Sequence, residues 1–182
     1  NLKFGESVKY LANLAGMRPY TFSKEDEIRE EKWNKYKMIY AKYVEFYHKD
    51  LFKNPLAKEA KDYLKNRNLT IEEVKKFKIG YVSNDENFKE EIFKEFNESE
   101  IRETGLFYFD ENKKKNVDRF RERIIFPINN ISGDPIALGG RTLKDNKYLA
   151  KYINSPETPF FKKGSNLYNL DFTRKLSNNI DN

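Results

Sequence analysis

The spacing of apolar residues changes once along this chain, at Gly105, and that change limits the folds open to it. Before Gly105, apolar side chains recur every three or four residues, which predicts amphipathic helices. After Gly105, aromatic and β-branched residues stand in short runs separated by turn residues, which predicts strands. We therefore expect an α+β fold. A mostly helical N-terminal half is followed by a mixed or antiparallel β lobe that contains a β-hairpin.

Capping residues, apolar faces and glycines divide the helical half into short segments. The predicted helices cover residues 6–15, 23–48, 55–67, 71–78 and 88–96, with a further short turn over 99–105. The strongest local signal is the pair Thr70 and Glu73, which forms a capping box. We expect Gly80 to end the helix that this box begins.

The segment 23–48 carries an aromatic stripe. Its members are Trp33, Tyr36, Tyr40, Tyr43 and Tyr47, at alternating spacings of 3 and 4 residues. Such a stripe can stack on nucleobases or pack against a neighbouring helix, and packing is the use we expect.

The second half predicts strands. The runs 120–128 and 135–143 flank the Gly-containing loop 131–134, so we expect them to pair as a β-hairpin. Shorter strands are predicted at 107–109 and near Tyr152. A helix is predicted around 166–175, and the lysine run 113–115 is interpreted as a solvated loop.

Composition narrows the function classes. The 182 residues include no cysteine and one histidine, which excludes disulfides, thiolate metal sites and imidazole clusters. The net charge of +6 is unevenly placed: residues 1–112 hold 21 Lys/Arg against 22 Asp/Glu, and residues 113–182 hold 14 against 7. This local excess favours a polyanionic partner. No apolar run is long enough for a membrane span and no signal-peptide pattern is present, so we expect a soluble intracellular protein without membrane contact.

Three arginines, Arg119, Arg121 and Arg123, stand at alternate positions of a predicted strand. Because strand side chains alternate between faces, the three guanidinium groups would share one face as a basic ridge. Guanidinium groups match phosphates in bidentate contacts, but they can equally pair with nearby carboxylates. The spacing leaves both interpretations open.

Two later motifs carry further polar groups. Gly139 and Gly140 before Arg141 mark either a β-bulge or a close approach of a ligand or backbone. The loop 151–158 and the lysine at 163 either contact phosphate and sugar or form ordinary surface. No nucleophile–histidine pair, metal-ligand motif or carboxylate cluster is found, so no catalytic residue and no metal ligand is assigned.

Six segments, taken together and in order, resemble the bacterial-type DNA primases. They are NPLAKEAKDYLKNRNLTIEEVKKFKIGY (54–81), GL (105–106), DRFRERIIFPI (118–128), GGR (139–141), KYINSPET (151–158) and FKKGSNLYNL (161–170). The resemblance implies that residues 1–22 are the tail of a zinc-binding domain and residues 23–49 a linker helix. Residues 50–182 would then be the N-terminal subdomain of the RNA polymerase core.

The resemblance also implies an activity. The intact protein would be an enzyme, a DNA-directed RNA polymerase (nucleotidyltransferase) that makes RNA primers for DNA replication in the bacterial cytoplasm. Zinc would lie upstream of this chain and the magnesium-binding TOPRIM carboxylates downstream, so this segment alone is predicted to be inactive. Its expected partners are single-stranded DNA template, RNA primer, nucleotides and, through a C-terminal domain outside the chain, the replicative helicase. The alternative is a non-catalytic module, derived from a primase lobe, that binds single-stranded nucleic acid or another partner.

By the same resemblance, eight residues line the groove for template and primer–template hybrid. They are Arg67, Arg119, Arg121, Arg123, Arg141, Lys151, Asn154 and Lys163. Asn68 stands where the family has a glycine, which is a departure next to Arg67. Tyr152 and Phe161 could add base stacking, although core packing is the role we expect for both.

Overall fold

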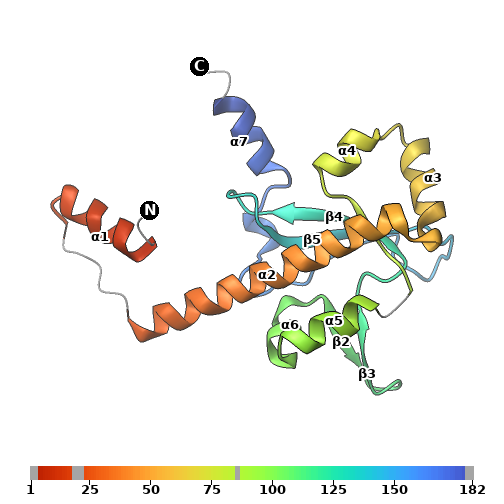
Figure 1. Cartoon of the computed structure of the whole chain (residues 1–182), viewed down its shortest axis with the longest axis horizontal. Coiled ribbons are helices and arrows are strands. Elements are labelled where there is room, and N and C mark those ends of the chain that lie inside the picture. Colours follow the sequence, from red (N-terminus) through yellow and green to blue (C-terminus); the bar gives the residue numbers. More distant parts are fainter. Residues whose placement is uncertain (1–3, 18–22, 85–86, 179–182) are drawn as a thin grey trace. The chain divides into compact units, whose positions relative to one another are not determined.

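A computed structural model of the chain describes residues 4–17, 23–84 and 87–178. The chain divides into two compact units, residues 1–34 and 35–182, which are described separately. The first unit contains helix α1 (Phe4–Leu14) and the start of the long helix α2 (Lys24–Lys53). The rest of α2 belongs to the second unit, which carries every other described element (Figure 1).

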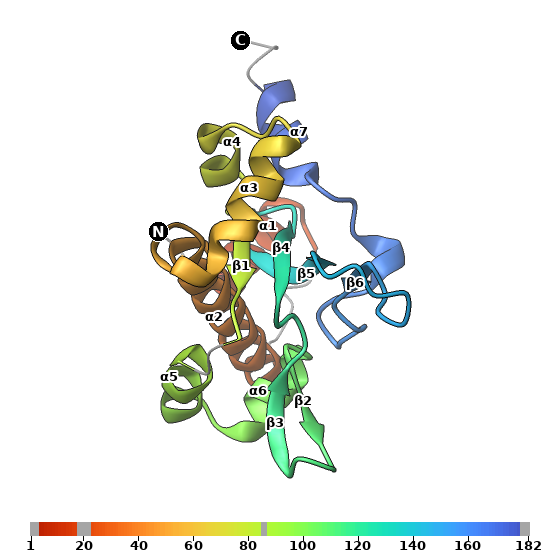
Figure 2. The same cartoon turned by 90° about the vertical axis from the view of Figure 1, so that its right-hand side faces the viewer.

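The second unit alternates helices and short strands (Figures 1 and 2). Its further helices are η1 (Pro55–Ala57), α3 (Lys58–Asn66), α4 (Ile71–Lys76), α5 (Asn87–Glu95), α6 (Glu98–Thr104), η2 (Lys163–Ser165) and α7 (Leu170–Asn178). Its strands are β1 (Gly80–Val82), β2 (Phe107–Asp110), β3 (Lys115–Asp118), β4 (Arg123–Asn129), β5 (Pro135–Thr142) and β6 (Tyr152–Asn154). The α+β expectation is confirmed.

The strands form two antiparallel sheets, and every described strand except β1 lies after Gly105. The larger has the order β1-β4-β5-β6, and the smaller pairs β2 with β3. The predicted hairpin is β4–β5, and the side chain of Asn130 closes its loop by accepting the backbone N–H groups of Ser132 and Asp134. The register shifts at Ile128/Asn129. The bulge predicted as one alternative at Gly139–Gly140 is therefore wrong.

Gly140 serves a close approach instead. A Cβ atom at this position would lie 2.6 Å from the ring of Phe120. The Phe120 side chain thus occupies the space that the glycine leaves open, and a ligand is not needed to explain this glycine.

The aromatic stripe of α2 packs, as expected, but against more than one helix. The tyrosines of the stripe that lie in the second unit are at most 2% exposed: Tyr36, Tyr40, Tyr43 and Tyr47. Tyr36 donates its hydroxyl to the carbonyl of Ile136 in β5 at 2.7 Å. Tyr40 donates to the carbonyl of Thr104 in α6 at 2.9 Å. The tyrosines therefore fasten α2 both to the larger sheet and to α6.

The other two hydroxyls meet at one carboxylate. Asp118, the last residue of β3, accepts from Tyr43 at 2.7 Å, from Tyr47 at 3.3 Å and from the backbone N–H of Phe120 at 2.7 Å. Loss of water around this carboxylate raises its pKa from 3.8 to about 6, against the opposing effect of the three donors. Asp118 thus joins α2 to the turn between β3 and β4.

Gly80 does not end a helix as predicted. The helix begun by the confirmed Thr70–Glu73 capping box ends at Lys76, and Lys78, with φ of 50°, makes the left-handed turn. Gly80 instead opens β1, where a Cβ atom would lie 2.9 Å from the backbone of Tyr47 and His48. The glycine allows β1 to lie directly against α2.

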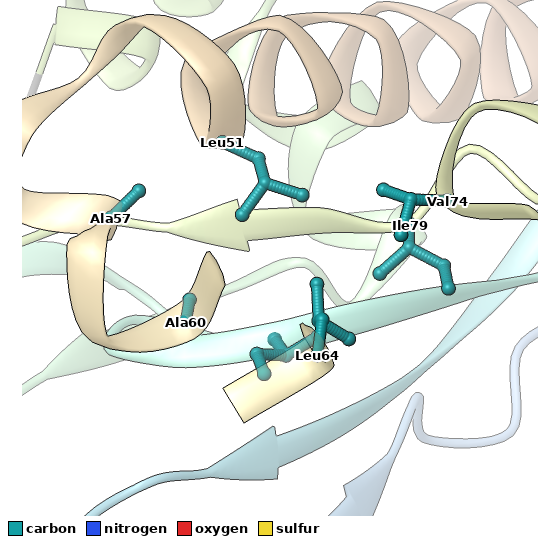
Figure 3. Close-up of a cluster of buried hydrophobic side chains, with 7 residues drawn as sticks. Leu51, Ala57, Ala60, Leu64, Val74 and Ile79 are labelled. Atoms are coloured by element: carbon teal, nitrogen blue, oxygen red, sulfur yellow. The ribbon is translucent and has the colours of Figure 1, made fainter. Parts of the chain in front are cut away.

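A hydrophobic cluster fixes α3 and α4 to the sheet (Figure 3). Its buried members are Leu51, Ala57, Ala60, Leu64, Val74, Ile79 and Ile124. Leu64 of α3 and Ile124 of β4 are at most 3% exposed, so this side of α3 is anchored. The anchoring sets the position of Tyr63, which packs against the same cluster.

The environment of Asp118 predicts a pH dependence of stability. Because its pKa is raised, the folded state holds this proton to a higher pH than the unfolded state does. The corresponding stability is complete below about pH 4 and is lost as the pH rises through about 6. We expect the free energy of unfolding of Asp118→Asn, measured by urea titration, to increase relative to that of the unsubstituted chain as the pH rises over that window. The gain should be at most about 3 kcal/mol, from the two-unit shift. Parallel pH profiles of the two proteins would contradict this account.

Candidate nucleic-acid interface

The strand register places three polar or aromatic side chains on one face of the larger sheet. Arg141 pairs with Ile124 on one side and with Tyr152 on the other, and Asn154 pairs with Gly139. Directly paired residues, and residues two apart, project from the same face. Ile124 belongs to the cluster that holds α3, so Arg141, Tyr152 and Asn154 share the face on which α3 packs.

Tyr63 of α3 contacts two arginine side chains on this face. The Arg141 guanidinium carbon lies 3.9 Å from the Tyr63 ring centroid and 5.8 Å from that of Tyr152. Arg67, one turn after Tyr63, donates from Nε to the Tyr63 hydroxyl at 2.9 Å, with its guanidinium carbon 5.4 Å from the ring. We call Tyr63, Arg67, Arg141, Tyr152 and Asn154 the Tyr63 cluster.

Arg141 is held rigidly inside the cluster. It is 8% exposed, donates to the carbonyl of Thr142 at 3.2 Å, and keeps its Nε buried without a hydrogen-bond partner. Stacking on Tyr63 offsets part of the cost of burying this cation. The arrangement presents a fixed positive charge between two aromatic rings, beside the exposed guanidinium of Arg67.

The predicted basic ridge of three arginines is wrong in its geometry. Arg119 and Arg121 lie in the turn between β3 and β4, and only Arg123 belongs to a strand. Glu122 adopts φ of 56°, and its backbone N–H donates to the carbonyl of Val82 at 2.6 Å. This left-handed residue breaks the alternation that an extended chain would have, so the three guanidinium groups have separate environments.

Arg119 and Arg123 both bind backbone of the chain itself. Arg119 donates from Nε to the carbonyl of Gly105 at 2.8 Å and lies over the ring of Tyr108. Arg123 is 8% exposed and donates to the carbonyls of Ala150 at 3.0 Å and Lys151 at 3.4 Å. Burial lowers the pKa of Arg123. Its observed contacts hold the loop before β6 in place.

The remaining predicted residues are exposed. Lys151 directly precedes β6, and its carbonyl accepts the Thr142 backbone N–H at 3.1 Å. Lys163 opens η2, where its backbone N–H donates to the Glu157 carboxylate at 3.2 Å. Arg121 faces a separate pocket near Asp118. The structure thus brings Arg67, Arg141 and Asn154 to the Tyr63 cluster and places Arg119 and Arg121 elsewhere.

Two aromatic residues of the cluster were not predicted as site residues. Tyr152 is 61% exposed, so the core packing expected for it is wrong, whereas Phe161 is buried as expected. Tyr63, for which no site role is predicted, lies in the helix predicted over 55–67. Its spacing of four residues from Arg67 is a signal that could have shown a stacked pair on one side of the helix.

The described residues form neither a metal site nor a membrane-spanning helix. Over 4–17, 23–84 and 87–178, no three His, Cys, Asp or Glu side chains gather in a way that could hold a metal ion. These residues therefore do not fit the zinc or magnesium that the resemblance implies for the intact enzyme. In the same ranges, no helix combines the length and apolar character that crossing a membrane requires.

Comparison with known proteins defines the class. The family of the DNA primase catalytic core, N-terminal domain, matches residues 46–174. This match covers well over half of the chain, which therefore belongs to that family.

Individual proteins similar to this chain are also primases. A DNA primase of Pseudomonas putida is 37% identical over 186 residues, which cover 100% of this chain and 28% of that protein. A solved structure of the DnaG primase catalytic domain bound to ssDNA is similar with a TM-score of 0.72 and 30% identity, over 82% of this chain and 46% of that one. The zinc-binding and RNA polymerase domains of Aquifex aeolicus primase give a TM-score of 0.67 and 30% identity, over 89% and 38%. The chain thus spans under a third of the length of its curated relative.

The contacts of Arg123 predict a positioning role that differs from that of Arg121. Arg123→Met removes charged hydrogen bonds to two carbonyls, so we expect the free energy of unfolding to fall by about 1.5–3 kcal/mol. Amide exchange at residues 144–151 should become faster. Arg121→Met is the matched control, with little effect on either measurement because Arg121 is exposed in a turn. Equal loop exchange in the two variants would refute the positioning role.

Proposed function

We propose that this chain is the part of a DNA primase core that holds single-stranded template, with the Tyr63 cluster as its grip. One observation carries the proposal: two arginines from different elements, Arg67 and Arg141, converge on one tyrosine beside an exposed aromatic ring. Membership of the primase-core family and similarity to a DnaG catalytic domain solved with ssDNA support it.

The cluster offers the two kinds of contact that a single strand needs. The exposed Arg67 can contact a backbone phosphate, contributing about −0.7 to the slope of log K against log salt. Tyr152 presents a ring on which a base can stack, worth about 1–3 kcal/mol. Asn154 on the same sheet face adds an amide donor and acceptor for sugar or phosphate.

We also propose the setting of this grip. The intact protein is a DNA-directed RNA polymerase that makes primers in the bacterial cytoplasm from nucleotides on a DNA template. Magnesium chemistry comes from TOPRIM carboxylates downstream, zinc belongs to a domain upstream, and a C-terminal domain contacts the replicative helicase. Residues 1–22, 23–49 and 50–182 then correspond to the zinc-domain tail, the linker helix and the N-terminal core subdomain. The present chain alone synthesises no RNA.

Two exposed members of the cluster test the proposal without disturbing the core. Arg67→Gln should reduce the salt slope for single-stranded DNA by about 0.7, because one phosphate contact is lost. Tyr152→Ala should cost about 1–3 kcal/mol of binding free energy through lost stacking. Fluorescence anisotropy with a labelled oligonucleotide measures both effects.

Matched controls carry the same chemical changes elsewhere. Lys75→Gln removes an exposed positive charge from α4, and Tyr148→Ala removes a tyrosine that is 85% exposed outside the cluster. Both should bind as the unsubstituted chain does. Equal losses in the cluster variants and the controls, or no loss in either, would rule out the cluster as the grip.

A further inference from the structure

A second cationic site lies around the turn that carries Arg121. A pocket of about 400 Å³ is lined by Lys89 of α5, Lys113 of the β2–β3 turn, Lys115 of β3 and Arg121. Asp118 and Glu122 also line it. Lys113 and Lys114 lie in an exposed turn, as expected for a solvated loop, whereas Lys115 begins β3. Folding brings Lys113 and Lys115 to the same pocket as Arg121.

The two carboxylates of the pocket each have partners besides its four cations. Glu122 lies 2.7 Å from Lys144 Nζ, and Asp118 accepts from Tyr43, Tyr47 and Phe120. Lys113 Nζ also lies 3.8 Å from Asp110 Oδ2. Four cationic side chains from separate segments still gather around one pocket, where a bound anion can contact several of them at once. Phosphate is the anion that guanidinium and ammonium groups match best in geometry and charge.

The pocket is separate from the Tyr63 cluster. Figure 2 shows β2 and β3 at the lower end of the second unit, whereas α3, which carries Tyr63 and is followed directly by Arg67, lies toward the upper end. The turn at Glu122 lies between the two sites along the chain. Arg121, before it, lines the pocket, and Arg123, after it, holds the loop that leads to Tyr152.

The lining also indicates the source of the phosphate. Among the described residues that line the pocket, the one aromatic side chain is Tyr47, which is 2% exposed and offers no face to a base. A site with several cations and no stacking surface suits a backbone phosphate better than a free nucleotide.

We propose that this pocket is a second phosphate site for the same single strand, away from the Tyr63 cluster, with Lys89, Lys113 and Lys115 joining Arg121 as its ligands. The proposal rests on the proposed template-binding function. It lengthens the strand that the chain can hold and adds no sequence preference, since phosphate contacts carry none.

The test compares oligonucleotide lengths. Anisotropy is measured with thymidine oligomers of about 6 and about 24 nucleotides, the short one within the range of a single site. The double variant K113Q/K115Q should bind the long oligomer about tenfold more weakly, with a salt slope smaller by about 1.4, because two contacts are lost. Its affinity for the short oligomer, held at the Tyr63 cluster, should not change.

The matched control K53Q/K75Q removes two exposed lysines outside both sites and should bind both lengths normally. Equal losses for the two lengths, or long-oligomer binding within twofold of the control, would overturn the pocket. Lysine-dependent binding of tripolyphosphate by calorimetry, with no effect on the long oligomer, would assign the pocket to a free polyphosphate and also overturn it. Failure of the Tyr63 cluster is distinguished by Tyr152→Ala, which would then leave binding of the short oligomer unaltered.

Discussion

The hydroxyl groups of the α2 tyrosines are the constraint on which the second unit depends. Each buried tyrosine oxygen would cost free energy without a hydrogen-bond partner, so α2 packs only where acceptors are in reach. Tyr36 and Tyr40 find carbonyls of β5 and α6, and Tyr43 and Tyr47 find Asp118. One helix face therefore determines where the hairpin, α6 and the β3–β4 turn lie.

The position of the candidate site depends on this packing of α2. Gly80 allows β1 to approach α2, and β1 in turn captures the backbone of Glu122 through the Val82 carbonyl. That contact separates Arg121 from Arg123. On the other face of the larger sheet, the Leu64–Ile124 cluster holds α3 so that Tyr63 meets Arg141. Both faces are therefore needed to place the basic residues.

The features that the sequence predicted correctly are those that depend on residues close together in the chain. The capping box of Thr70 and Glu73 and the β4–β5 hairpin depend on neighbouring residues and are confirmed. The basic ridge failed because the backbone of Glu122 is set by β1, about forty residues earlier in the chain. Gly80 failed as a helix stop because its reason is the distant α2 backbone. Tyr152 was assigned to the core because an aromatic residue in a strand gives no sign of which sheet face stays open.

Photo-crosslinking is the most direct test of whether template lies on the Tyr63 cluster. Single-stranded DNA carrying 5-iodouracil is irradiated with the chain, and the crosslinked residues are identified by mass spectrometry. If template lies on the Tyr63 cluster, crosslinks form at Tyr152 first and Tyr63 next, and they are lost when excess unlabelled strand competes. Crosslinks confined to aromatic residues outside the cluster, such as Tyr108 or Tyr148, would contradict it.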